Sequence, residues 1–227
     1  MGQVVIRVEG IYKSFGRDEN RVEVLKGLHL SIEEGERVAI TGASGVGKTT
    51  LLHILGALEH PTEGKVYYGD LDIFSLGDRD LTHFRNRNIG FVFQFHHLLP
   101  EFNALENVMM PALIYGMDKE EAEAKAEEVL IEVGLKGRLL HRPGELSGGE
   151  QQRVAVARAL ILKPKVLLAD EPMGNLDVKT GEAVADLMVS LNMERGITMV
   201  VATHNVALAR RMGRRLALVD GKALPLP

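Results

Sequence analysis

A glycine-rich run from Gly42 to Thr49 contains the residues best suited to chemistry in this 227-residue sequence. It reads Gly-Ala-Ser-Gly-Val-Gly-Lys-Thr and fits the phosphate-loop pattern G-x-x-x-x-G-K-[ST]. Glycines let the backbone approach a polyphosphate closely, so that successive N–H groups and a helix N-terminus face the anion. Lys48 supplies positive charge to the outer phosphates, and the Thr49 hydroxyl can ligate Mg²⁺. The residues expected around the nucleotide are Gly42, Ala43, Ser44, Gly45, Val46, Gly47, Lys48, Thr49 and Thr50. By itself this loop does not separate an ATPase from a kinase or a GTPase.

A second chemical feature is the apolar run 166–169, which is followed by Asp170 and Glu171. A continuous apolar run is typical of a strand buried in a parallel sheet. Asp170, at the end of this strand, can hold Mg²⁺ next to Thr49, directly or through water. Glu171 is one residue further on, faces a different direction and can polarise an attacking water. Strands that end in a carboxylate are common, so this assignment depends on the phosphate loop.

A third feature, residues 146–153, reads Leu-Ser-Gly-Gly-Glu-Gln-Gln-Arg. Ser147 is a good N-cap, and Gly148 and Gly149 are expected to leave the backbone N–H groups at the helix start accessible. Such a helix start binds anions, so it offers a second potential phosphate site far along the chain from the first. The plain alternative is a capped helix without a ligand.

These motifs require an α/β core to position them. Residues 4–8 and 22–32 alternate apolar and polar positions, which predicts antiparallel strands. Further strands are predicted at 38–40, 67–73, 89–93, 166–169 and 199–202, and helices at 48–58, 105–114, 118–133, 151–162 and 179–194. Strands that alternate with helices indicate an α/β fold, with antiparallel strands at the front and a helical insert in the middle.

Composition and charge exclude several classes of protein. The apolar share of 45% and the charged share of 26% are ordinary for a globular protein. The net charge is −4, so no basic field argues for a nucleic-acid partner, and none is expected. No stretch approaches the roughly 18 apolar residues of a membrane-spanning helix. Cysteine is absent, which excludes disulfides and thiolate metal sites. The basic cluster Arg210, Arg211, Arg214 and Arg215 is expected to be a solvent-facing helix end, and the alternative is contact with anionic lipid headgroups or nucleic acid.

The string Leu-Ser-Gly-Gly-Glu at residues 146–150 resembles the signature of the ABC-transporter ATPase family, L-S-G-G-[EQ]. Other motifs of that family match in the same order along the chain. Gln94 matches the Q-loop, residues 175–177 match the D-loop, and His204 matches the switch histidine. Tyr12 lies where the family has an aromatic residue that stacks on adenine. Met173 departs from the Thr or Ser of relatives, at a position without a catalytic role.

The resemblance implies an α/β P-loop NTPase fold, with a mostly parallel core sheet flanked by helices, an antiparallel β subdomain and a helical subdomain. It implies a single ABC ATPase domain over residues 1–227, with the helical subdomain at approximately 95–163. The implied cofactors are ATP and Mg²⁺, and ATP is expected to join the phosphate loop of one chain to the signature of a second in a homodimer. The implied catalytic residues are Lys48, Gln94, Glu171 and His204. The implied nucleotide contacts outside the phosphate loop are Tyr12, Ser147, Gly148, Gly149 and Asp177, and the implied metal ligands are Thr49, Gln94 and Asp170.

Residues 94–102, Gln-Phe-His-His-Leu-Leu-Pro-Glu-Phe, resemble the ATP-binding subunits of bacterial lipoprotein-releasing (Lol-type) systems, as do residues 205–212. In the ABC family the surface around the Q-loop receives short helices of integral membrane subunits, so permease subunits are expected to dock near residues 94–102. The resemblance implies a peripheral protein on the cytoplasmic face of the bacterial inner membrane that drives lipoprotein release. The alternatives are macrolide-efflux-type and cell-division ATPases, a soluble ABC ATPase of DNA repair or translation, and a small-molecule kinase.

Overall fold

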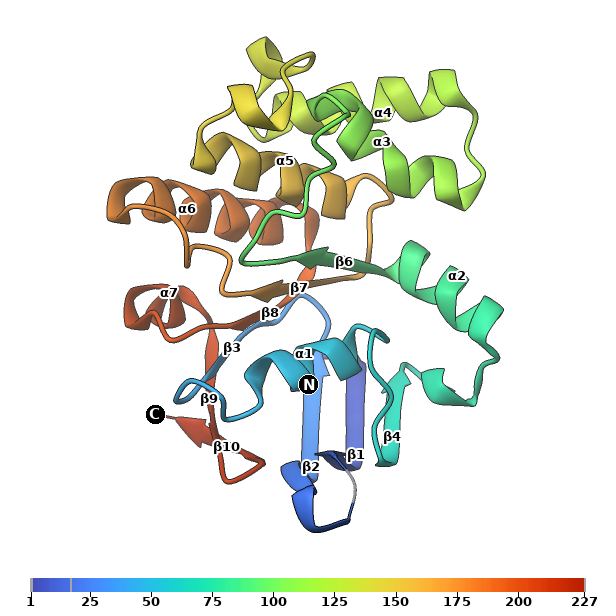
Figure 1. The fold of residues 1–227 in the computed structure, drawn as a ribbon, viewed down its shortest axis with the longest axis vertical. Coiled ribbons are helices and arrows are strands. Elements are labelled where there is room, and N and C mark those ends of the chain that lie inside the picture. The colour runs from blue at the N-terminus through green and yellow to red at the C-terminus, as the bar shows by residue number, and fades with distance from the viewer. Residues whose placement is uncertain (1, 17, 227) are drawn as a thin grey trace.

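The strands form two sheets within residues 2–16 and 18–226, the part of the chain that this computed structural model describes (Figure 1). The strands are β1 (Val4–Phe15), β2 (Val22–Glu33), β3 (Arg37–Thr41), β4 (Glu63–Tyr68), β5 (Leu71–Asp72), β6 (Ile89–Val92), β7 (Val166–Asp170), β8 (Thr198–Ala202), β9 (Arg214–Val219) and β10 (Lys222–Leu226). The smaller sheet has the order β2-β1-β4-β5 and is antiparallel. The larger sheet has the order β10-β9-β3-β8-β7-β6.

The larger sheet is parallel from β9 to β6, and β10 runs antiparallel to β9. Every residue of β7 and β8 is buried, which explains why both strands are continuous apolar runs in the sequence. Parallel pairing brings the carboxyl ends of β3, β8 and β7 to one edge of the sheet, where ligands bind in open α/β sheets.

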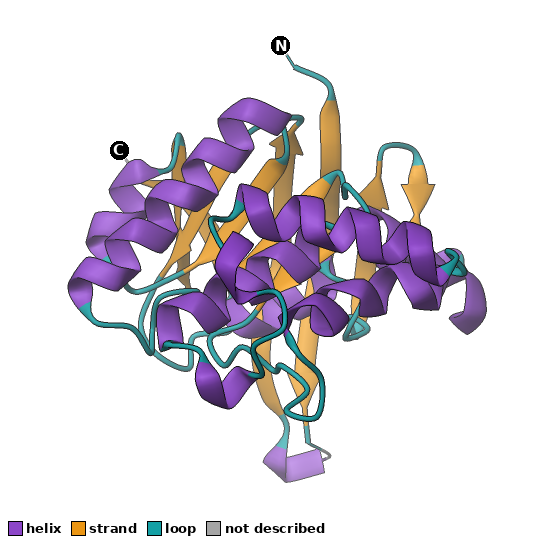
Figure 2. Ribbon diagram, turned by 90° about the horizontal axis from the view of Figure 1, so that it is seen from above, coloured by secondary structure: helices purple, strands orange, loops and turns teal. Residues whose placement is uncertain are grey.

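Helices lie on both sides of the larger sheet (Figures 1 and 2). They are α1 (Lys48–Leu55), α2 (Asp78–Asn88), α3 (Ala104–Tyr115), α4 (Lys119–Glu132), α5 (Gly148–Leu160), α6 (Val178–Arg195) and α7 (Val206–Arg211). Short 3₁₀ turns occupy Asp18–Asn20, Ile73–Ser75, Lys136–Arg138 and Pro143–Glu145. No helix within the described residues is long and apolar enough to cross a bilayer.

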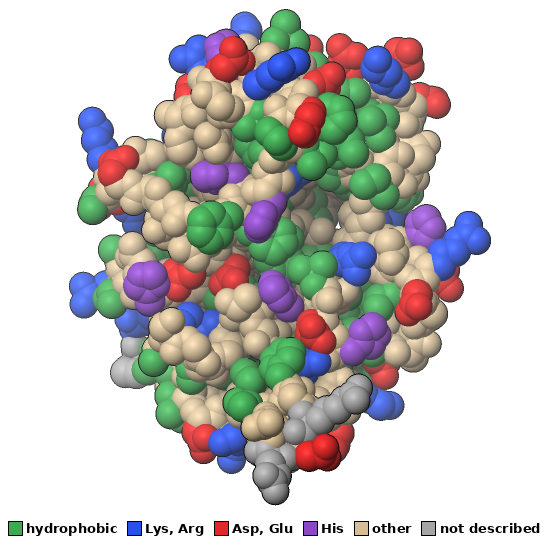
Figure 3. Space-filling model, viewed as in Figure 1, with side chains coloured by type: hydrophobic (Ala, Val, Ile, Leu, Met, Phe, Trp, Pro, Cys, Tyr) green, Lys and Arg blue, Asp and Glu red, His purple; other side chains and the backbone are tan. Residues whose placement is uncertain are grey.

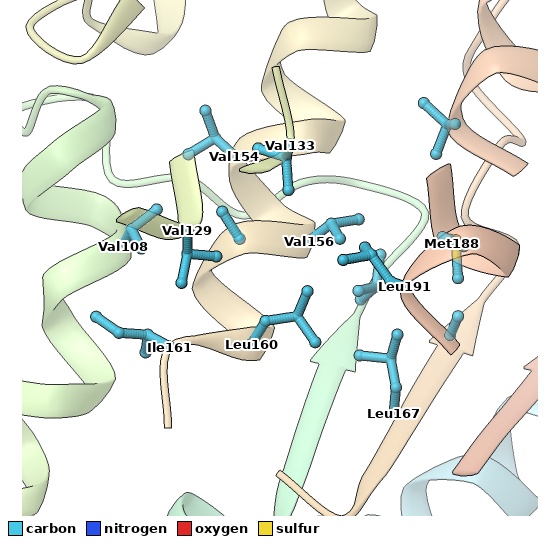
Figure 4. Packing of buried hydrophobic residues seen from close by; sticks show 14 of the residues in the cluster. Val108, Val129, Val133, Val154, Val156, Leu160, Ile161, Leu167, Met188 and Leu191 are labelled. Atoms are coloured by element: carbon cyan, nitrogen blue, oxygen red, sulfur yellow. The ribbon is translucent and has the colours of Figure 1, made fainter. Parts of the chain in front are cut away.

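The larger sheet separates two hydrophobic cores. Successive residues of a strand point to opposite faces, and Leu167 and Leu168 accordingly join different cores. The upper core packs α3, α4, α5 and α6 on one face, and Figure 4 shows Leu160, Leu167 and Leu191 meeting there. The lower core joins α1 and the smaller sheet to the other face. The sheet is therefore buried on both sides, and its strand ends stay in fixed positions.

The predicted α/β architecture is confirmed, and each predicted strand and helix corresponds to an observed element. The helix expected at 48–58 is wrong at its end, because α1 stops at Leu55 and is capped by the backbone of Gly56. The basic cluster is also placed differently. Arg210 and Arg211 lie in the last turn of α7, but Arg214 and Arg215 begin strand β9, whose pairing with β3 overrides helix continuation.

Buried Asn107 on α3 fixes the irregular backbone that precedes this helix. Its Oδ1 accepts a hydrogen bond from the Leu99 N–H at 2.8 Å. Its Nδ2 donates to the carbonyl oxygens of Leu99, Phe102 and Asn103 at 3.1, 3.0 and 2.9 Å. The side chain is fully buried, and its two N–H groups are shared among the three carbonyl oxygens.

We expect Asn107→Ala to lower the free energy of unfolding by about 3 kcal/mol, because it leaves several backbone groups without partners. The control is Asn103→Ala, which removes one exposed helix cap and is expected to cost about 1 kcal/mol. Urea unfolding of both variants measures the difference. Equal costs would contradict this role of Asn107.

Candidate nucleotide-binding and catalytic site

The phosphate loop runs from the end of β3 to the start of α1. Two of its glycines are required because neighbouring atoms leave no room for a Cβ. A Cβ on Gly47 (φ +107°) would lie 2.5 Å from Val24 Cγ1, and a Cβ on Gly42 (φ +152°) would lie 2.8 Å from the Leu218 carbonyl oxygen. A Cβ on Gly45 (φ +77°) would meet nothing within 4 Å. Helix α1 has no side-chain cap, so its first N–H groups face the loop and remain suited to an anion.

Lys48 holds the phosphate loop in shape from within. Its side chain is buried, and Nζ donates to the carbonyl oxygens of Gly42 at 2.9 Å and Ala43 at 3.0 Å. An ammonium group has three protons, so one donor remains beyond these two bonds. Lys48 can therefore stabilise the loop and contact a phosphate at the same time.

Asp170, the last residue of β7, has the properties of a cation ligand. It is 9% exposed, and its Oδ1 is buried without a hydrogen-bond partner. Burial raises the pKa of the Asp170 carboxyl, while a hydrogen bond with the Thr49 side chain and the charge of Lys48 act to lower it. An unpaired buried carboxylate oxygen beside a hydroxyl fits Mg²⁺, which prefers oxygen ligands.

Glu171 is held by the residues that follow β8. The Thr203 hydroxyl donates to Glu171 Oε2 at 3.0 Å, and the His204 backbone N–H donates to Oε1 at 2.9 Å. His204 Nδ1 lies 2.7 Å from the same Oε1. Glu171 also has φ +44°, an uncommon left-handed conformation for a residue with a side chain. These contacts orient the carboxylate at the sheet edge, next to Asp170.

The Q-loop residue Gln94 contacts the D-loop of the same chain. Asn175 Nδ2 donates to the Gln94 carbonyl oxygen at 3.1 Å, and Gln94 Nε2 lies 3.4 Å from Asn175 Oδ1. A Cβ on Gly174 would lie 2.8 Å from Gln94 Nε2, so glycine permits this approach. Of the expected metal ligands, the structure brings Thr49 and Asp170 together, whereas Gln94 hydrogen-bonds Asn175.

The expected second phosphate site is the capped N-terminus of α5. Ser147 Oγ accepts from the Glu150 N–H at 3.3 Å, and Glu150 Oε2 accepts from the Ser147 N–H at 2.8 Å, which forms a capping box. Gly148 is exposed, but Gly149 is buried, and a Cβ there would lie 2.3 Å from Thr180 Cγ2. The expected accessibility therefore extends to Gly148 and not to Gly149, which packs on α6.

The remaining expected nucleotide contacts are Tyr12 and Asp177. Tyr12 on β1 is 42% exposed. Its hydroxyl lies close to Gly27, since a Cβ on Gly27 would be 2.8 Å from the hydroxyl oxygen. An exposed ring of this kind is free to stack on a base. Asp177 caps α6 by accepting from the Thr180 N–H at 3.1 Å, and hydrogen bonds from Thr180 lower the pKa of its carboxyl.

Sequence reasoning missed three residues that complete this arrangement. Thr203 and Asn175 lie within matched motifs, but only the fold shows that they hold Glu171 and Gln94. Glu150 has a visible signal, because it is the third residue after Ser147 in the capping-box pattern S-x-x-E.

Comparison with known proteins decides the family. Residues 25–174 match the family described as "ABC transporter". The chain belongs to the ABC transporter family. It is therefore an ABC ATPase, an ATP-hydrolysing subunit whose fold is the P-loop fold predicted from its motifs.

Relatives and solved structures cover nearly the whole of this ABC ATPase. A LolD protein of Geobacter metallireducens, described as a lipoprotein-releasing system ATP-binding protein, is 58% identical over 97% of this chain and 98% of its own length. LolD of Syntrophus aciditrophicus is 57% identical over 96% and 98%. A dimeric ATP-binding cassette in a post-hydrolysis state, bound to ADP and Pi, is 43% identical with a TM-score of 0.88, and 96% of each chain is covered. A second dimeric structure, of a bacterial ABC transporter cassette, is 44% identical with the same TM-score and coverage.

We expect Glu171→Gln to lower the ATPase kcat at least about 100-fold, because the amide keeps the size and shape of the carboxylate but cannot accept a proton from water. ATP binding is expected to stay unchanged, since the phosphate loop is untouched. Steady-state ATPase assays and nucleotide titration measure the two effects. The control is Glu194→Gln, an exposed carboxylate on α6, and normal turnover in Glu171→Gln would contradict the assignment.

The Glu150 capping box predicts a pH-dependent contribution to stability. Hydrogen bonds from the Ser147 backbone, then Arg138 and the Ser147 hydroxyl, lower the pKa of Glu150 to about 2. A lowered carboxyl pKa stabilises the fold fully above the ordinary value of 4.5, and this contribution is lost as pH falls toward 2. The difference in unfolding free energy between the wild type and Glu150→Gln should be constant above pH 4.5 and shrink below it. A pH-independent difference would contradict this origin.

Proposed function

We propose that this ABC ATPase drives membrane subunits that release lipoproteins from the bacterial inner membrane, and that it acts at the cytoplasmic face as a peripheral protein. The support for the cargo class is the identity of 58% and 57% to two proteins described as lipoprotein-releasing, over nearly their full lengths. We further propose one ABC ATPase domain, with residues 95–163 as its helical subdomain.

One observation carries the proposed chemistry: the Glu171 carboxylate is held by Thr203 and His204 at the strand edge that also carries the phosphate loop. In that position Glu171 serves as general base for the attacking water, and His204 orients it and contacts the γ-phosphate. Lys48 neutralises charge on the outer phosphates. Thr49 and Asp170, with Gln94 proposed as a third ligand, would hold Mg²⁺, which would supply positive charge against the phosphates of ATP.

The second half of the site comes from a second copy of the chain. Helix α5 lies in the upper part of the molecule and α1 in the lower part, so the signature and the phosphate loop of one chain belong to different layers (Figure 1). In the proposed homodimer, Ser147 and the N-terminus of α5 add donors to the γ-phosphate of ATP held by the other chain. Two similar cassettes have been solved as dimers, which supports this arrangement.

The membrane partner is proposed to dock on residues 94–102, here named the docking segment, and on the exposed surface of α3. Hydrophobic side chains gather over α3 and the loop before it (Figure 3). Phe95 is 63% exposed, and Ile114 at the end of α3 is 64% exposed. A cleft of about 160 Å³ lies between α2, α3 and α5, with Arg85, Phe91 and Pro111 in its walls. An apolar surface beside a cleft suits a short helix of a partner protein.

The proposal is tested by affinity isolation of the Glu171→Gln protein from native membranes in the presence of ATP. Integral membrane subunits and lipid-modified cargo are expected to copurify, because the arrested enzyme keeps its ATP-bound form. Recovery of membrane subunits of an efflux or cell-division complex would show that the ATPase serves that complex and not lipoprotein release. Recovery of ribosomes or DNA, without membrane proteins, would overturn the membrane role.

Phe95→Glu in the Glu171→Gln background tests the docking surface. A buried charge in an apolar interface is costly, so recovery of the membrane subunits should fall at least about tenfold while ATP binding stays intact. The control is Met193→Glu, which places the same charge on an exposed side chain of α6. Undiminished recovery with Phe95→Glu would place the partner elsewhere.

A further inference from the structure

The docking segment has no regular secondary structure, yet one arginine of α5 holds two of its consecutive carbonyl groups. Arg158 Nη1 donates to the His97 carbonyl oxygen at 2.7 Å, and Nη2 donates to the His96 carbonyl oxygen at 2.7 Å. Both bonds are short and come from a charged donor, the kind that contributes most to stability. The planar guanidinium gives each carbonyl its own nitrogen in a fixed geometry, whereas a lysine ammonium presents a single nitrogen on a flexible stem.

The backbone at these carbonyls requires such support. His97 has φ +48°, a left-handed conformation that costs free energy for a residue with a side chain. Arg158 is half-buried, and burial lowers the pKa of its guanidinium. Gln152, six residues earlier on α5, adds a longer contact of 3.4 Å from its Nε2 to the Phe93 carbonyl oxygen, directly before the docking segment. The docking segment and the residue before it therefore both contact α5.

Helix α5 connects this clamp to the signature. It has 13 residues, with Ser147 as its N-cap and Arg158 in its last turn. A helix of this length is a rigid rod of roughly 20 Å. Arg158 also lines the cleft between α2, α3 and α5, so a partner seated there would lie against the clamp.

We propose that Arg158 is a positioning residue that makes the docking segment and the signature helix move as one body. A displacement of the docking segment by a membrane partner then reaches Ser147, at the opposite end of α5, as a rigid-body movement. This inference rests on the proposed docking of membrane subunits. It gives Arg158 no contact with ATP and no part in the chemical step.

The test compares Arg158→Lys with Arg153→Lys, a matched control on the same helix. Arg153 Nη1 also donates to a backbone carbonyl, that of Val133 at 2.9 Å, but it holds the end of α4 and not the docking segment. ATPase rates and KM are measured for the isolated subunit and for the complex with its membrane subunits in proteoliposomes. In Arg158→Lys, the isolated subunit should keep its kcat and KM within about twofold. The stimulation by the membrane subunits should fall about tenfold, since one flexible nitrogen replaces the two fixed nitrogens that hold the carbonyls. Arg153→Lys should keep both.

Equal stimulation of Arg158→Lys and the wild type would overturn the inference. So would an equal loss of isolated and stimulated activity, because that indicates a general folding role. Hydrogen exchange on the wild-type complex provides a second test that needs no variant. Membrane subunits should raise amide protection both in residues 94–102 and at residues 147–150, and protection confined to the former would overturn the coupling.

The two proposals fail in different ways. A wild-type subunit that no membrane subunit stimulates, and a Glu171→Gln protein that captures none, would overturn the proposed function and this inference together. A wild-type subunit that is stimulated, with Arg158→Lys stimulated equally, would overturn the role of Arg158 alone.

Discussion

The backbone hydrogen bonds that pair β3 with β8 and β8 with β7 bring together the phosphate loop, Glu171 and His204 of this ABC ATPase. Their register places Ile40 beside Ala202 and Ala202 beside Asp170, so the three strands end in a row. The residues that follow these strand ends carry the phosphate loop, Thr203 with His204, and Glu171. Groups far apart in the sequence become neighbours because parallel strands end at a common edge. Packing on both faces keeps that edge rigid.

Two adjacent carboxylates acquire different properties from this edge. Asp170 is still within the sheet, so it is buried and keeps an oxygen without a partner. Glu171 lies one residue beyond the sheet, where Thr203 and His204 donate to both of its oxygens. The first environment suits a cation, and the second holds a carboxylate in position for a proton. The division of roles follows from one step along the backbone.

The helical layer joins the sheet through an irregular segment that depends on side chains for its shape. Asn107 forms hydrogen bonds with backbone groups of the loop before α3, and Arg158 donates to the carbonyl oxygens of His96 and His97. Gln94 forms hydrogen bonds with Asn175 of the D-loop. Helices and sheets pair their own backbone N–H and C=O groups, whereas the backbone groups of a loop need hydrogen-bond partners from other parts of the chain. The same contacts that keep this segment ordered therefore connect the docking segment, the D-loop and the signature helix.

The sequence by itself determined the features that arise from local physics. The glycine pattern with Lys48 and Thr49 predicts the phosphate loop, Ser147 predicts a helix start, and the apolar runs predict the buried strands. The sequence did not predict α2 and β9, whose local patterns are weak. Helix α2 is polar and buries Leu81, and β9 begins with two arginines and is a strand because it pairs with β3. Only the tertiary structure decided which residues hold Glu171, Gln94 and the docking segment. Their partners Thr203, Asn175 and Arg158 lie 32, 81 and 61 residues away along the chain. Hydrogen bonds at that separation form only once the strands have paired and the layers have packed.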